Sequence, residues 1–67
     1  MKNLRTLELY AVREDANPDL AMIIMNMIQN TREDLGPKAS KTKYLSYLKT
    51  NIKERLTDDM RKDWRKI

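Results

Sequence analysis

The chain has no cysteine, no histidine and no phenylalanine, and its 67 residues include one glycine and two prolines. Without cysteine, no disulfide can support the small core that so short a chain is able to build. The joint absence of cysteine and histidine argues against a structural zinc site. It also removes the commonest general base and the best nucleophiles. We therefore expect no metal, no cofactor and no enzymatic activity.

The carboxylates do not form a catalytic arrangement either. Most of them occur as sequence neighbours, at Glu14-Asp15, Glu33-Asp34 and Asp58-Asp59. Neighbours on a helix point about 100° apart, so the two groups of a pair do not converge on one substrate. Such pairs are typical of helix ends, where charge complements the dipole. No glycine-rich phosphate loop or metal motif is present, and we expect no small-molecule substrate.

Long apolar runs are also missing. The longest, residues 20–28, is interrupted by Asn26 and is far shorter than the roughly 20 residues that span a bilayer. Lys2 and Arg5 are not followed by an apolar leader segment. A basic amphipathic stripe over residues 45–67 would suit a membrane surface, but a bundle needs the same stripe for its core. We expect no membrane partner and a cytoplasmic location.

The residues that are abundant favour helix, and the chain is clearly punctuated. Asn17-Pro18 starts a helix that Gly36 ends, and Ser40 caps another. Thr57 followed by two aspartates suits a further first turn, although the apolar stripe from residue 45 to 67 also stays in phase as one long helix. Residues 7–12 alternate enough to allow a strand as the alternative. The predicted helices are residues 3–15, 18–35, 40–56 and 57–66.

These elements predict a single all-α domain over residues 1–67, a small bundle of three to four helices with the second at its centre. Self-association through that helix would add the buried surface that a short chain lacks. The expected core consists of the apolar residues that recur at helical spacing. They are Leu4, Leu7, Ala11, Leu20, Ile24, Met27, Ile28, Leu35, Leu45, Leu48, Ile52, Leu56 and Met60.

The second helix carries more apolar residues than one packed face requires. On a helical projection Met22 falls among polar residues and Met25 lies at the edge of the apolar side. A central helix buried nearly all round would explain both. The alternative is a contact surface, which suits the flexible methionine side chain. We predict a protein interface at Met22 and Met25, with Trp64 as a further anchor that continues the stripe through Met60.

Charge is divided unequally along the chain. Residues 1–36 carry four Lys/Arg against six Asp/Glu, a net charge of −2, and residues 37–67 carry ten against four, a net charge of +6. A solvated helical face would explain this basic half, and an acidic partner or a nucleic acid would use it. The candidate residues for such a partner are Lys38, Lys41, Lys43, Tyr44, Tyr47, Lys49, Lys53 and Arg55.

Residues 32–48 resemble a helix-turn-helix motif, because a helix ends at Gly36, a short turn follows, and a capped basic helix begins near Ser40. The turn differs from the motif in carrying Pro37, Lys38 and Lys41 where such motifs usually bury an apolar residue. The resemblance implies a reading helix with a defined set of residues toward DNA. They are Lys41, Thr42, Lys43, Ser46 and Lys49.

Two functions follow as expectations. The first is a small non-enzymatic helical module that acts by protein–protein association, as a regulator, inhibitor or assembly factor, on another protein or on a second copy of itself. The alternative is a DNA- or RNA-binding protein that uses the basic face of residues 38–66. The two are compatible, since a dimer would present two basic halves to one duplex.

Overall fold

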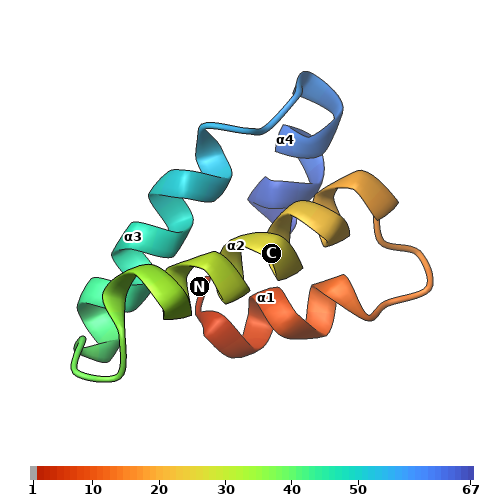
Figure 1. The fold of residues 1–67 in the computed structure, drawn as a ribbon. Coiled ribbons are helices and arrows are strands. Elements are labelled where there is room, and N and C mark those ends of the chain that lie inside the picture. Colours follow the sequence, from red (N-terminus) through yellow and green to blue (C-terminus); the bar gives the residue numbers. More distant parts are fainter. Residues whose placement is uncertain (1) are drawn as a thin grey trace.

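Four helices follow one another in the structure, a computed structural model that describes residues 2–67 (Figure 1). They are α1 (Leu4–Ala11), α2 (Pro18–Leu35), α3 (Lys41–Lys53) and α4 (Asp58–Lys66). The described residues contain no strand. α1 runs back along α2 in the opposite direction, and α3 packs against α2 after a short turn (Figure 1). The predicted small all-α bundle is confirmed.

Local signals set the limits of α2 as predicted. The Asn17 side chain accepts hydrogen bonds from the backbone amides of Asp19 (2.9 Å) and Leu20 (3.3 Å), and Pro18 occupies the first helical position. At the other end Gly36 has a φ of 71°, a conformation that glycine adopts without strain. Ser40 then caps α3 through its hydroxyl, which accepts from the Lys43 amide at 3.2 Å.

Two helices are shorter than predicted. α1 ends at Ala11 rather than at residue 15, and the amides of Arg13 and Ala16 instead form turn hydrogen bonds to carbonyls three residues before them. α3 ends at Lys53 rather than at residue 56, again with turn-type bonds, from the amides of Arg55 and Leu56. The predicted break near Thr57 is confirmed, because α4 begins at Asp58. The break lets α4 turn back toward the core.

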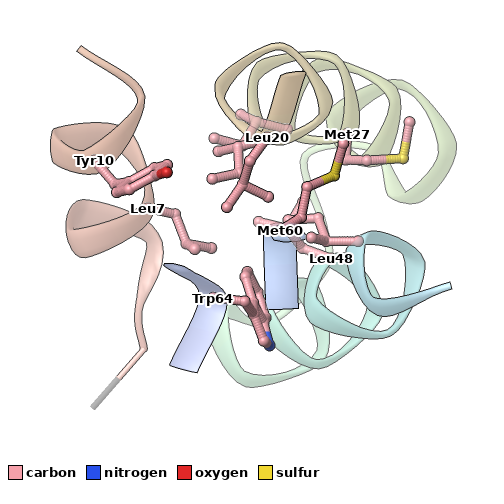
Figure 2. Close-up of a cluster of buried hydrophobic side chains, with 10 residues drawn as sticks. Leu7, Tyr10, Leu20, Met27, Leu48, Met60 and Trp64 are labelled. Atoms are coloured by element: carbon pink, nitrogen blue, oxygen red, sulfur yellow. The ribbon is translucent and has the colours of Figure 1, made fainter. Parts of the chain in front are cut away.

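The core draws on all four helices (Figure 2). Its buried members are Leu7, Tyr10, Leu20, Ile24, Met27, Ile28, Leu48, Ile52, Met60 and Trp64. Four other expected members, Leu4, Ala11, Leu45 and Leu56, are partly buried and pack against this cluster. Leu35, in the last turn of α2, is half-buried and lies outside the cluster. Tyr10 and Trp64 are core residues that the expected set lacked.

The Tyr10 hydroxyl joins three parts of the chain. It donates a hydrogen bond to Asp63 Oδ2 of α4 at 2.7 Å and accepts one from the backbone amide of Asn17 at 2.8 Å. Burial raises the pKa of Tyr10 above its ordinary value of 10.0, and the bond to the Asp63 carboxylate acts in the same direction. The neutral phenol is therefore the form that holds α1, the start of α2 and α4 together.

Tyr10→Phe is expected to lower the free energy of unfolding by about 1–3 kcal/mol, because the Asn17 amide and the Asp63 carboxylate are each left without a partner. Urea denaturation followed by circular dichroism measures this difference. No loss of stability in the variant would show that water replaces the hydroxyl at no cost.

The pH dependence of the stability difference between the wild type and Tyr10→Phe tests whether the pKa of Tyr10 is raised. Because the pKa is higher in the folded than in the unfolded chain, the contribution of Tyr10 is complete below about pH 10 and is lost as the pH rises through the folded value. The stability difference between the wild type and Tyr10→Phe should therefore be constant at neutral pH and shrink above pH 10.

Candidate binding surfaces

Most of the large apolar side chains that remain exposed lie on α1 and α2. Leu9 and Val12 are 52% and 74% exposed, and Met22 and Met25 are 63% and 49% exposed. Tyr47 of α3 is the one other large hydrophobic residue of the described chain with comparable exposure. Leu9 and Val12 are one turn apart, as are Met22 and Met25. We call these four residues the apolar surface.

An ion pair indicates on which side of the α1–α2 pair Val12 and Met25 lie. Glu8 of α1 and Arg32 of α2 approach to 3.9 Å between Oε1 and Nη2, which places them on one side of the antiparallel pair. Val12 lies one turn beyond Glu8, and Met25 lies two turns before Arg32 on the same helical face. Since the two helices are antiparallel, the path from Glu8 to Val12 along α1 and the path from Arg32 to Met25 along α2 lead in the same direction in space. Val12 and Met25 thus lie along the same α1–α2 seam.

Trp64 does not belong to this surface. It is 5% exposed and packs in the core with Met60 (Figure 2), and the Lys2 ammonium lies over its ring at 5.0 Å from the centroid. From the sequence, Trp64 continues the helical stripe through Met60 and is predicted as an interface anchor, whereas the structure encloses its side chain. Met22 and Met25 are therefore the two predicted interface residues that are accessible to a partner.

The basic half presents many cations that form no ion pair. Lys38, Lys41, Lys43, Lys53 and Arg55 are exposed, and Lys49 is half-buried. Within residues 2–67 the ion pairs are Arg13–Asp15, Arg32–Glu8 and Arg61–Asp58. Of the ten Lys/Arg in residues 37–67, only Arg61 therefore has a carboxylate within 4.0 Å. The other nine side chains leave their charge free to meet a negatively charged surface.

The two tyrosines of α3 differ in how much of each ring is exposed to a binding partner. Tyr44 is half-buried against the core, and its hydroxyl donates to the Ile28 carbonyl at 3.0 Å. Tyr47 is 39% exposed, and its hydroxyl donates to Asp34 Oδ2 at 3.2 Å. Tyr47 is therefore the more exposed of the two rings, whereas Tyr44 is partly covered by the core.

The residues expected to face DNA are divided between two sides of α3. A groove of about 610 Å³ on the outer side is lined by residues that are nearly all uncharged. They are Ser40, Thr42, Lys43, Ser46, Tyr47, Thr50 and Asn51. Lys41 lies on the other side, in a separate cleft, and Lys49 is half-buried. The helix-turn-helix-like set therefore does not form one continuous cationic face.

That separate cleft, of about 680 Å³, was not found from the sequence. It is formed where the start of α1, the end of α2 and the start of α3 meet, and three cations of separate segments line it: Arg5, Arg32 and Lys41. Leu4, Tyr44 and Leu45 supply apolar walls. Two of the cations come from the acidic half of the chain, which is why the division of charge along the sequence did not indicate this site.

Other kinds of site are not seen in the described residues. No helix of residues 2–67 has the length and hydropathy to cross a bilayer. The same residues contain no cluster of three or more acidic side chains suited to a metal ion. Comparisons of the chain with protein-family models, with curated proteins and with solved structures gave no match.

Trp64→Ala is expected to cost about 3–5 kcal/mol of unfolding free energy, because it removes a large side chain from the core. Met22→Ala is the matched control on the surface and should change stability by no more than about 0.5 kcal/mol. Equilibrium urea unfolding of both variants, at a concentration where the protein is monomeric, measures the two effects. Equal effects would contradict the assignment of Trp64 to the core.

Proposed function

We propose that this chain is a non-enzymatic helical module that acts by protein–protein association, and that the apolar surface pairs it with a second copy. The observation that carries the proposal is the exposure of Met22 and Met25 beside Leu9 and Val12. The buried core consists of other residues, so these four side chains remain available for a contact outside it. Unbranched methionines adapt well to a second surface, which is a reason to expect them in an interface.

Pairing of two copies through the apolar surface avoids the strongest charge repulsion that this chain offers. The apolar surface belongs to residues 1–36, which carry a net charge of −2, whereas the +6 of the chain lies in residues 37–67. Two copies that meet through the apolar surface keep their strongly basic segments out of the contact. A chain of this length also gains stability from added buried area.

Met22→Asp is expected to shift the protein from dimer to monomer, because it places a charge in the centre of an apolar contact. Sedimentation velocity over a concentration series measures the dissociation constant, which should rise at least about tenfold. Asn30→Asp is the matched control, since Asn30 is also exposed on α2 and the added charge is the same. Circular dichroism verifies that both variants remain folded.

A wild-type chain that stays monomeric at high micromolar concentration would contradict pairing of two copies. An unchanged dimer in Met22→Asp would show that the contact uses another surface. Loss of the dimer in both variants would assign the effect to net charge rather than to the apolar surface.

A second function is favoured by the unpaired cations of the basic half. Nine Lys/Arg of residues 37–67 have no carboxylate within ion-pair distance, so this half presents a positive charge that attracts an anionic surface. A phosphate backbone would neutralise them and release counterions. We propose binding of a nucleic acid by this half as the alternative function, compatible with a dimer that presents the basic half twice.

Replacing Lys43, Lys49 and Lys53 together by glutamine is expected to weaken binding to labelled duplex DNA and single-stranded RNA. The slope of log K against log salt should flatten by about 0.7–0.9 for each phosphate that is no longer neutralised. Fluorescence anisotropy at several salt concentrations measures both changes. The matched control replaces Arg5, Arg13 and Arg32 by glutamine, which removes the same charge from the other half. Wild-type binding that is independent of salt would end this alternative.

A further inference from the structure

We propose that the cleft between the start of α1 and the α2–α3 turn binds an acidic peptide segment of a partner protein, with an apolar side chain of the peptide on its floor. This site goes beyond the pairing of two copies and does not depend on it. It shares no residue with the apolar surface, and Arg32 is two turns, about 10 Å, farther along α2 than Met25.

The floor of the cleft is apolar and already in place. Leu4, Tyr44 and Leu45 line it, and all three pack against the buried cluster from partly exposed positions. The hydrogen bond from the Tyr44 hydroxyl to the Ile28 carbonyl, 3.0 Å, holds the aromatic ring in position. An apolar side chain that enters therefore meets a preformed surface, and little conformational freedom is lost on binding.

The turn that closes one end is held by its own residues. Gly36 ends α2 with a φ of 71°, Pro37 has a restricted backbone, and the Ser40 hydroxyl caps α3. Gly36, Pro37 and Ala39 all line the cleft, and together they present small or apolar groups rather than polar ones. This end of the cleft is therefore as apolar as its floor, and an apolar side chain can contact both.

The charged groups around the floor are mostly positive. Arg5, Arg32 and Lys41 face the cleft, and Glu8 is the one carboxylate among its lining residues, which gives a local net charge of +2. Glu8 meets only Arg32, at 3.9 Å, and both side chains are about half-exposed or more. Such a pair is weak and is easily exchanged for an incoming carboxylate. Arg5 and Lys41 form no ion pair in the described chain.

An acidic peptide fits these features better than other anions do. A volume of about 680 Å³ holds a few side chains, and the combination of an apolar floor with surrounding cations requires both an apolar anchor and carboxylates in one ligand. The phosphates of a nucleic acid would pair with the three cations, but they would make no contact with the apolar floor. Carboxylates on an extended segment, spaced around a leucine, would use both.

The experiment measures anisotropy of a fluorescein-labelled peptide Glu-Asp-Leu-Leu-Glu-Asp with the full chain. Binding in the micromolar to high micromolar range is expected, and Lys41→Glu should weaken it about tenfold or more, as should Arg5→Glu. Lys43→Glu is the matched control: it makes the same change of charge on α3, and Lys43 lines the groove on the outer side of the helix. A peptide with serine in place of leucine should also bind more weakly, because it lacks the anchor.

The outcomes separate this site from its alternatives. If Lys41→Glu and Lys43→Glu weakened peptide binding equally, the proposal would be overturned, since the loss of affinity would reflect the net charge of the protein alone. Binding of dodecanoate without binding of the peptide would overturn it in favour of a fatty-acid site. Met22→Asp leaves every lining residue in place and should bind the peptide as the wild type does, so failure of the dimer and failure of this site are distinguishable.

Discussion

The Tyr10 hydroxyl makes the one side-chain hydrogen bond that joins α4 to another helix in residues 2–67. α4 is short and separated from α3 by a break, and it is held by the packing of Met60 and Trp64 and by the bond from Tyr10 to Asp63. The same hydroxyl accepts from the Asn17 amide, at the cap of α2. One phenol thus links the end of α1, the start of α2 and the middle of α4, and a polar group in this position requires both partners to offset its burial.

The distribution of apolar side chains explains why two different surfaces are available for binding. The stripes of α2, α3 and α4 turn inward and are used in the core, which leaves Met22 and Met25 outside together with Leu9 and Val12. The cleft arises differently, where the start of α1, the end of α2 and the start of α3 meet, so that partly buried Leu4, Tyr44 and Leu45 line it together with three cations. An adaptable apolar surface suits a second copy, and a rigid charged cleft suits an acidic segment.

The sequence predicted the helical class, the limits of α2, the break before α4 and most of the core. The limits of α2 follow from its capping residues and the core from apolar periodicity, whereas Thr57 makes no side-chain cap hydrogen bond at the start of α4. The sequence predicted α1 and α3 as too long, because the turn hydrogen bonds after Ala11 and Lys53 leave no strong signal in residue type. It also predicted the exposed methionines correctly as residues outside the apolar stripe, but placed Trp64 among the interface residues although it is buried.

The sequence by itself determined where the helices start, where α2 ends, which side of each helix is apolar, and how charge divides between the two halves. Only the tertiary structure decided that Tyr10 would join Asn17 and Asp63, that Trp64 would be enclosed, and that Arg5, Arg32 and Lys41 would surround one cleft. The physical reason is the distance along the sequence over which each effect acts. Caps and apolar periodicity depend on residues within a few positions of one another, whereas these contacts join residues of different segments of the chain, which meet only when the helices pack.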